Sequence, residues 1–447
     1  MIASNAILLA LMTTLFLALG YLGVPVAFAL IAGVLVGTAF TPITLQSMMA
    51  QLFNGIDSEA LMAIPFFLLV GELMTSANVV IRIAELSQAL VGHVRGGLAQ
   101  VTTVFSMFFS GMSGSSSADV AVLSRTMAKP MAQEGYRPAF TAALIAAAST
   151  IAALVPPSIM AVVYGAIGNV SIAGLFLGGI APGLFIGFGL MLYCYFFGPI
   201  GFRRPRATFG QLAKATRSAA LPMMIPVILL GGIMTGWFTP TEAGVIAVAY
   251  ILLVVIPLLN PAHLRQVPRD FVLAGMIYAL PMITIAAASA FGWVLAYLRG
   301  PIVVSGWIGA LAGDNAALTM FCLVVVFVIV GDFIEPVPAI IIFMPVVNAL
   351  TDQASINPVH MGVVLIVTLA FGLITPPYGL ALLMASKFLD VRFSLALKAS
   401  LPIYLIFFAA IAFTIFLPEV VLWLPRHVFP ESVGCFKSPT GPGYICP

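Results

Sequence analysis

The sequence is poor in charged residues. Only 7% of its 447 residues are charged and 62% are apolar, whereas about 25% of the residues in a soluble domain are charged. This balance excludes an ordinary soluble enzyme or binding domain. Long apolar runs recur from end to end, and a membrane-spanning helix needs about 20 mostly apolar residues. The composition therefore predicts an all-α polytopic membrane protein.

Signals of several other classes are missing as well. No basic residue precedes the first apolar run, so we expect a retained helix rather than a cleaved signal peptide. The four cysteines and four histidines show no metal-ligand spacing. The HExxH motif of zinc proteases is absent, and the sequence VIVGD lacks the first glycine of a GxGD protease motif. An intramembrane enzyme is therefore the less favoured function.

The apolar runs predict ten spanning segments. They lie at about 5–21, 26–40, 61–78, 138–167, 172–197, 219–236, 241–259, 271–298, 359–386 and 396–424. Two further apolar pairs, at about 98–129 and 317–351, are each interrupted by a polar or proline-rich tip. Irregular backbone at membrane depth is tolerated only where protein buries it or where it lines a cavity. We therefore expect two re-entrant hairpins.

The basic residues predict which side of the membrane each loop faces. Residues 201–218 hold five of the 18 lysines and arginines, and such an excess is typical of a cytoplasmic loop. Counted outward from this loop, fifteen basic residues face the cytoplasm, and three, Arg299, Arg426 and Lys437, face outside. We therefore expect both termini on the outer side.

The C-terminal tail, at 425–447, carries Cys435 and Cys446. Prolines and glycines between these two cysteines allow the chain to turn. An oxidising outer compartment permits a disulfide between them. A disordered terminus with two free thiols is the alternative.

A shift of 220 positions superimposes two parts of the sequence without a gap. The matching residues are Gly111 with Gly331, Pro138 with Pro358, Pro156-Pro157 with Pro376-Pro377, and Pro182 with Pro402. Glycine and proline fix backbone geometry, so their recurrence in register indicates a duplicated fold. Each half, at 1–200 and 219–424, holds five spanning segments and one hairpin. Because five is odd, the halves are inverted relative to each other, which is characteristic of secondary transporters.

The two hairpin tips are the most polar stretches between apolar runs. The first reads SGMSGSSSAD, where glycines permit a tight turn and serines offer hydroxyl and carbonyl oxygens. Asp119 adds a carboxylate in the first turn of the returning helix. The second tip, GDFIEPVP, contains Asp332 and Glu335. Ionisable groups at membrane depth are costly and usually functional, so we expect these three acids to serve the site.

A double proline breaks each of two spanning segments, at Pro156-Pro157 and at Pro376-Pro377. Proline removes helical N–H donors and so frees carbonyl oxygens near Ser149, Thr150, Ser158, Gly372 and Thr375. Several oxygens suit a small hard cation, and sodium fits better than a metal that needs thiolate or imidazole. Helix N-termini at the tips would attract an anionic solute. Close packing or a simple kink explains each piece alone, but not why tip and break recur together.

These segments also resemble a known family. GGLAQVTTVFSMFFSGMSGSSSADVAVL, GGIMTGWFTPTEAGVIAVAY, GDFIEPVPAIIIFMPVV and INPVHMGVVLIVTLAFGLITPPYGLAL are similar to the large membrane subunit of tripartite ATP-independent periplasmic (TRAP) transporters. The resemblance covers residues 1–425. It implies an elevator-type, sodium-coupled importer in the bacterial inner membrane. In that membrane, the outer side expected for both termini from the basic residues is the periplasm. The resemblance also implies two partners, a small membrane subunit and a periplasmic binding protein that delivers a carboxylate-bearing solute.

The resemblance further implies the residues of the site. The first sodium site would comprise Ser113, Gly114, Ser116, Thr150, Val155 and Pro156, and the second Gly331, Asp332, Pro336, Gly372 and Thr375. The residues expected to face the solute are Ser115, Ser117, Asp119, Pro157, Ser158, Glu335 and Pro377. Sodium is the only metal expected, as coupling ion, and no cofactor is expected.

The chain departs from the family pattern at the second tip. The usual aspartate before proline is replaced by Glu335, and Asp332 is an additional acid. A proton-coupled transporter or antiporter of organic anions is therefore the alternative within the same class. A channel could use the same oxygens, but it usually gains its pore by symmetry between subunits.

Overall fold

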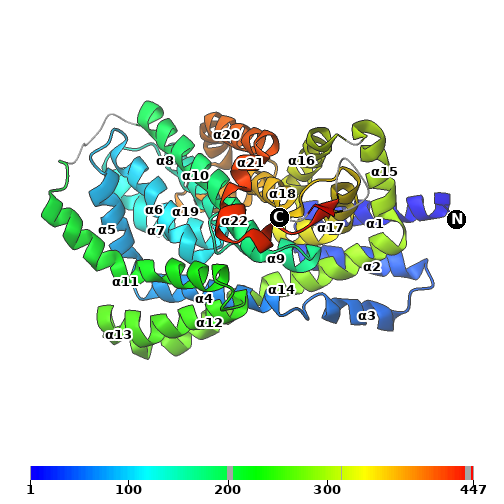
Figure 1. Cartoon of the computed structure of the whole chain (residues 1–447), viewed down its shortest axis with the longest axis horizontal. Helices are drawn as coiled ribbons and strands as arrows, with labels where there is room; N and C mark the ends of the chain where they lie inside the picture. The colour runs from blue at the N-terminus through cyan, green and yellow to red at the C-terminus, as the bar shows by residue number, and fades with distance from the viewer. Residues whose placement is uncertain (1, 199–204, 314, 438–443, 446–447) are drawn as a thin grey trace.

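The computed structural model describes residues 2–198, 205–313, 315–437 and 444–445. Almost every described element is a helix (Figure 1). Seven helices in this part of the chain are individually long and apolar enough to cross a membrane, and other apolar helices are shorter. The predicted all-α polytopic architecture is thus confirmed.

One group of helices, which we call the frame, surrounds the long helix α14. It comprises α1 (Ile2–Tyr21), α2 (Val26–Ala39), α3 (Leu45–Asn54), η1 (Ala60–Met62), α4 (Ala63–Ser76), α11 (Phe209–Met234), α12 (Pro240–Tyr250), the π-helical η3 (Ile251–Val255), α13 (Ile256–Leu259), η4 (Pro261–Arg265) and α14 (Val267–Tyr297). Helix α14 packs on α2, α3 and α4, while α12 packs on α4 and α11. The frame therefore brings the start of each sequence half together.

The second group, which we call the core block, contains both hairpins and both broken helices. It comprises α6 (Gly97–Ser113), α7 (Ser116–Gln133), α8 (Pro138–Ser149), η2 (Thr150–Ala153), α9 (Ile159–Gly168), α10 (Ile172–Phe197), α16 (Ala316–Phe333), α17 (Pro336–Gln353), α18 (Pro358–Gly372), α19 (Leu380–Phe388) and α20 (Phe393–Phe416). Helices α8 and α18 are buried along nearly their whole length, because every side of them is covered by protein.

The duplication continues through the three-dimensional contacts. Helices α7, α8 and α10 are followed 220 positions later by α17, α18 and α20, each starting within about one residue of the expected position. Helix α7 packs on α19 and α17 packs on α9, while α8 packs on α20 and α18 on α10. Each half therefore contacts the other half through equivalent elements. This exchange is what a two-fold relation between the halves requires, and it supports the inverted repeat.

Two short helices join the frame to the hairpins. They are α5 (Val80–Val91) and α15 (Gly300–Ala312), again 220 positions apart. Helix α5 contacts α11 of the frame and α6 of the block, and α15 contacts α14, α16 and α17. The axes of α4 and α5 differ by 77°, so α5 runs across the direction of α4. These helices fix the base of each hairpin to the frame.

Several predicted boundaries were wrong. The segment 61–78 ends at Ser76 and turns into α5, and α3 and α15 were not predicted because they are too short for a spanning segment. The segment 396–424 ends as α20 at Phe416, because Pro418 begins a separate short helix. The tail continues as α21 (Pro418–Val421), α22 (Trp423–Val428), η5 (Pro430–Val433) and the antiparallel strands β1 (Phe436–Lys437) and β2 (Tyr444–Ile445).

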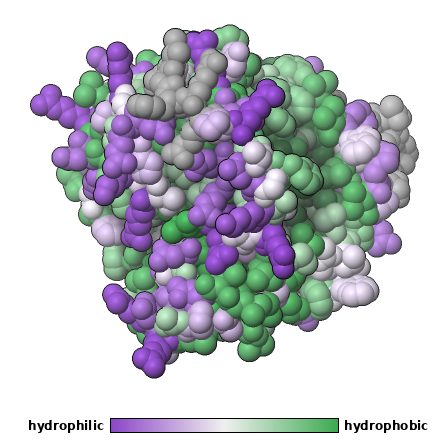
Figure 2. Space-filling view, turned by 90° about the vertical axis from the view of Figure 1, so that its left-hand side faces the viewer, coloured by the Kyte–Doolittle hydropathy of each residue, from purple (hydrophilic) through white to green (hydrophobic). Residues whose placement is uncertain are grey.

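The surface at the left-hand end of Figure 1 combines two kinds of side chain. Figure 2 shows hydrophilic side chains gathered over part of this end, beside continuous apolar surface. Helix α5 and the first turns of α11 lie at this end (Figure 1). Apolar surface beside a polar patch is what a membrane protein presents where it emerges from the lipid.

Candidate functional site

The first hairpin tip lies directly against the break between α8 and α9. Helix α6 ends at Ser113, and Gly114 turns the chain with a positive φ of 60°. The Ile159 N–H donates to the Gly114 carbonyl at 3.3 Å. A Cβ at Gly114 would lie 2.4 Å from the Pro157 oxygen, so only glycine fits this approach. The tip and the break thus share one oxygen-rich region.

The second tip repeats this contact with different atoms. A Cβ on Gly372 of α18 would lie 3.1 Å from the backbone of Gly331 at the end of α16. The Tyr378 N–H donates to the Asp332 carbonyl at 3.3 Å, and the Thr375 hydroxyl donates to the Asp332 carboxylate at 2.5 Å. The structure therefore brings together Gly331, Asp332, Gly372 and Thr375, four of the five residues named in the prediction of a second sodium site.

Each break removes backbone donors where the two prolines stand. Both Pro-Pro peptide bonds are cis. Pro156 and Pro157 have no N–H, so the carbonyls of Ala152 and Ala153 lose their usual helical donors. The Ser158 hydroxyl donates to the Ala153 carbonyl at 2.5 Å. The Ser158 hydroxyl thus replaces the missing donor to Ala153, while the Ala152 carbonyl loses its usual helical donor.

One buried hydroxyl at the first tip, that of Ser116, forms no hydrogen bond with a described residue. A buried polar atom without a protein partner is costly, and a bound water or ion is one way to satisfy it. The helices α6 and α7 of the tip contact η2, which carries Thr150. The donor set is hydroxyls and carbonyls, which fits sodium.

The residues predicted to line the first site differ in burial and in the hydrogen bonds that they form. Ser113, Gly114, Thr150 and Pro156 are all buried, and Val155 is half-buried. The Thr150 hydroxyl donates to the Ala147 carbonyl at 2.8 Å, which leaves its lone pairs available. At the second site, Pro336 is buried at the first position of α17. The structure gathers these residues on neighbouring elements.

The residues predicted to face the solute fall into two sets. Ser117, Glu335 and Pro377 are exposed at the tips and at the second break. Ser115 is half-buried, and its hydroxyl caps α7 by accepting from the Ala118 N–H at 3.5 Å. These four are accessible to a solute in this structure.

Three residues of that prediction lie differently from the expected position. Pro157 and Ser158 are buried at the first break. Asp119 is fully buried, and both its carboxylate oxygens accept hydrogen bonds from serines of α6, Ser110 and Ser113. In this structure Asp119 therefore faces its own hairpin rather than a solute. A carboxylate near the start of a helix can point inward when neighbouring hydroxyls satisfy it.

Sequence reasoning missed two partners of the site. Ser110 was not singled out, although it lies three residues before Ser113 in the same polar tip. Tyr404 of α20 donates its hydroxyl to the Ile374 carbonyl at 2.7 Å, directly before the second break. A tyrosine inside an apolar run was the only signal in the sequence, since the contact joins residues 30 positions apart.

An open cavity of about 510 Å³ lies between the frame and the core block. Its frame wall comes from Ser58–Ala60 and Thr239–Thr241. Its block wall comes from the turn between α9 and α10, including Ala166 and Asn169. The cavity is one place where space lies between the two groups of helices, which pack directly elsewhere, as α14 does on α17 and η1 on α9.

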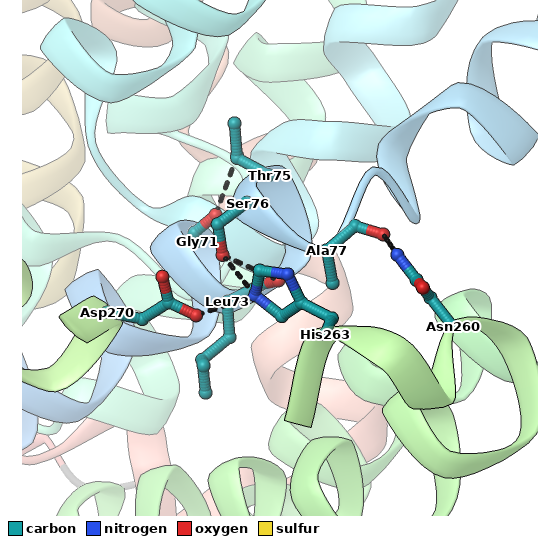
Figure 3. A network of polar contacts seen from close by, with 8 residues as sticks. All are labelled: Gly71, Leu73, Thr75, Ser76, Ala77, Asn260, His263 and Asp270. Carbon is teal, nitrogen blue, oxygen red and sulfur yellow. Dashed lines mark hydrogen bonds and ion pairs between the residues drawn. The ribbon is translucent and has the colours of Figure 1, made fainter. Parts of the chain in front are cut away.

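A separate polar cluster has the residue types of a hydrolase triad but not its geometry. Asp270 and Ser76 both contact the same ring nitrogen, Nε2 of His263, at 2.7 and 3.2 Å (Figure 3). A triad uses one ring nitrogen for the serine and the other for the aspartate. Asn260 also donates to the Ala77 carbonyl at 3.1 Å (Figure 3). The cluster therefore ties η4 and α14 to the end of α4 inside the frame.

The described ranges contain no cluster of the side chains that usually bind transition metals. Within residues 2–198, 205–313, 315–437 and 444–445, no group of three His, Cys, Asp or Glu side chains is placed to hold a metal ion. Cys194 and Cys322 are free thiols in α10 and α16. Cys435 is disulfide-bonded, and Cys446 lies outside the described residues, so the pairing of these two stays a prediction.

Known proteins are similar in sequence to this chain over most of its length. The family model of the tripartite ATP-independent periplasmic transporter, DctM component, matches residues 13–420. The C4-dicarboxylate TRAP transporter large permease protein DctM of Pseudomonas aeruginosa is 35% identical over 400 residues, 89% of this chain and 93% of that protein. The sialic acid TRAP transporter large permease protein SiaM of Vibrio cholerae is 34% identical over 417 residues, covering 92% of this chain and 97% of that protein.

The fold also resembles a solved transporter. The YdaH transporter of Alcanivorax borkumensis superimposes with a TM-score of 0.57 at 13% identity, covering 87% of this chain and 90% of that chain. This likeness concerns the fold alone. The relatives matched by sequence are named as transporter permeases rather than enzymes. The chain therefore belongs to the DctM family of large TRAP transporter permeases, multi-pass proteins of the bacterial inner membrane.

Proposed function

We propose that this permease imports a small carboxylate-bearing solute, such as a dicarboxylate, a sugar acid or a sialic acid, in symport with sodium. The observation that carries the proposal is the double contact between tip and break, at Gly114 with Pro157 and at Gly331 with Gly372. Each contact collects hydroxyl and carbonyl oxygens in the interior of the core block. Oxygen donors of this kind are the ones that hold sodium in transporters built from inverted repeats.

The chemistry of the solute follows from the helix ends and from the relatives. Helices α7 and α17 begin at the two tips, and a helix N-terminus favours an anion. Two relatives are named for C4-dicarboxylates and for sialic acid, and both of these solutes carry carboxylates. We therefore propose a carboxylate as the group that the tips recognise.

We further propose that the core block moves against the frame as an elevator. The cavity between Ser58–Ala60 and the α9–α10 turn supports this division, because it leaves space at one edge of the boundary between the two groups of helices. The exposed apolar side chains of α11 and α14, including Met224, Val227 and Leu280, give the frame a surface for the small membrane subunit. A periplasmic binding protein would deliver the solute to the outer face.

The proposal includes a sidedness, with both termini in the periplasm. It is supported by the distribution of basic residues, fifteen against three, between the two sets of loops. A periplasmic tail also agrees with the disulfide at Cys435, because disulfides persist in oxidising compartments.

Uptake into proteoliposomes tests the function. The permease is reconstituted with its small subunit, and carboxylate uptake is measured with and without the binding protein under an inward sodium gradient. We expect uptake only with both the gradient and the binding protein. Uptake driven equally well by a proton gradient without sodium would instead favour the proton-coupled alternative. Uptake that needs no gradient would favour a channel.

A further inference from the structure

Each tip contains a carboxylate that accepts a hydrogen bond from a hydroxyl predicted to bind sodium. In the first hairpin the Ser113 hydroxyl donates to Asp119. At the second tip the Thr375 hydroxyl donates to Asp332 at 2.5 Å, and its other acceptors are backbone carbonyls farther away, at 3.2 and 3.3 Å. A hydroxyl has one proton, and the charged acceptor is the stronger one. The same chemical pair therefore occurs at both sites.

These two pairs are not copies made by the duplication. Ser113 and Asp119 correspond to Phe333 and Ala339 in the second half. The Asp332–Thr375 pair, in turn, corresponds to the apolar Met112 and Val155 in the first half. The first pair lies within one hairpin, whereas the second joins a hairpin to a broken helix. The hydroxyl–carboxylate pair therefore occurs in both halves at positions that are not equivalent, so the symmetry of the backbone does not account for it.

The pairing has a direct consequence for cation binding. A hydroxyl oxygen has two lone pairs and one proton, and the proton must point away from a bound cation. When a carboxylate accepts the hydrogen bond of that hydroxyl, the hydroxyl oxygen presents only its lone pairs to anything else nearby. Partners that orient a ligand in this way are a regular part of metal sites.

Burial distinguishes this role from direct binding at the first site. Both oxygens of Asp119 are already occupied by Ser110 and Ser113, and the side chain is fully buried. The neighbouring Ser116 hydroxyl is a buried group without a hydrogen-bond partner among the described residues. A cation at the tip therefore meets the serine oxygens before it meets the carboxylate.

We propose that Asp119 and Asp332 are positioning residues, which orient Ser113 and Thr375 so that their hydroxyl oxygens face the sodium ions. The inference rests on the proposed sodium coupling and deepens it. It replaces the expectation that Asp119 faces the solute. It also assigns Asp332 to the ion site through Thr375 rather than as a direct ligand.

The test is the sodium-dependent thermal stability of the purified permease complex. The complex is heated in increasing sodium chloride, with choline chloride keeping the ionic strength constant, and the sodium concentration at half-maximal stabilisation is recorded. Variants Asp119→Asn and Ser113→Ala should each raise this concentration at least about tenfold, and the double variant should raise it no further. The set Asp332→Asn, Thr375→Ala and their double variant should behave in the same way.

Ser106→Ala is the matched control. The buried Ser106 hydroxyl, on the same helix as Ser113, donates to the Ala148 carbonyl at 2.7 Å and not to Asp119. Its loss should lower the melting temperature without moving the sodium midpoint. The conservative Ser113→Thr keeps the hydroxyl and should retain a midpoint near that of the wild type. If Asp119→Asn does not fold, this variant and the second-site set still decide the question.

The outcomes separate this inference from the function on which it rests. Multiplying effects in the double variants would overturn it, because each aspartate would then act independently of its hydroxyl. Unchanged midpoints in the aspartate variants would overturn it as well. A wild-type complex that shows no response to sodium would instead refute the sodium coupling itself.

Discussion

Replacing Gly114 by alanine tests whether the first tip must touch the break between α8 and α9. Gly114 has a φ of 60°, a conformation that costs a non-glycine residue about 1–2 kcal/mol. The new Cβ would also lie 2.4 Å from the Pro157 oxygen, whereas ordinary contact begins at 3.4 Å. The obstructing atom belongs to the backbone, so no rotamer change removes the overlap. The tip and the break must therefore separate by about 1 Å, the difference between these two distances.

A displacement of this size should disable the first sodium site. Functional constellations must be held within about 0.5 Å of their working geometry. We expect the sodium concentration that half-saturates uptake into proteoliposomes to rise at least about tenfold, which corresponds to about 1.4 kcal/mol. The assay varies sodium at constant ionic strength, with solute and binding protein in excess.

Gly135→Ala is the control for the backbone penalty. Gly135 also has a positive φ, 79°, but nothing lies within 4 Å of a Cβ built there. This variant should lose stability of the same order as the φ cost and keep the wild-type sodium response. A Gly114→Ala protein with the wild-type sodium response would refute the assignment of the first tip. Equal shifts in the two variants would show that backbone strain, and not the overlap, is responsible.

Three further predictions concern the ion, the motion and the tail. Ser116→Ala removes the buried hydroxyl that has no partner among the described residues, so it should weaken the sodium dependence of uptake severalfold while changing stability little. Cysteines replacing Ala60 and Ala166, on opposite walls of the cavity, should stop transport when joined by a short bifunctional maleimide while solute binding continues. A membrane-impermeant thiol reagent should label Cys435 and Cys446 in spheroplasts after reduction and neither residue before it.

Each of these experiments has a matched control or a contrary outcome. Ser124 also carries a buried hydroxyl without a partner in the described part of the chain, but it lies two turns along α7, so Ser124→Ala should leave the sodium response unchanged. Cysteines replacing Glu59 and Thr241, which contact each other within the frame, should tolerate cross-linking. Full turnover after efficient joining of frame and block would exclude the elevator. Tail labelling only after the membrane is opened would reverse the topology.

The sequence was most informative where residues fix the backbone. Pro138 and Pro358 begin α8 and α18, and the double prolines stand at the breaks that follow. Proline has one φ and no N–H, so its effect is local and does not depend on the surrounding fold. Spanning helices were predicted for a similar reason, because apolar length alone decides whether a segment can cross a lipid bilayer.

Short helices and side-chain directions were harder to predict from the sequence. Helices α3, α5 and α15 are too short to be recognised by apolar length, and their positions depend on the helices they contact. The inward direction of Asp119 could not be read from its place in the tip, because the serines that satisfy it lie on the opposite arm of the hairpin.

The sequence by itself determined the membrane class, the duplication and the oxygen-rich composition of both sites, because these follow from apolar length and from the local effects of glycine and proline. Only the tertiary structure decided which oxygens meet. Contacts such as Gly331 with Gly372, Thr375 with Asp332, and Tyr404 with Ile374 join residues that are far apart in the chain. Such contacts depend on how α16, α18 and α20 pack together, and packing of this kind leaves no local pattern in a single sequence.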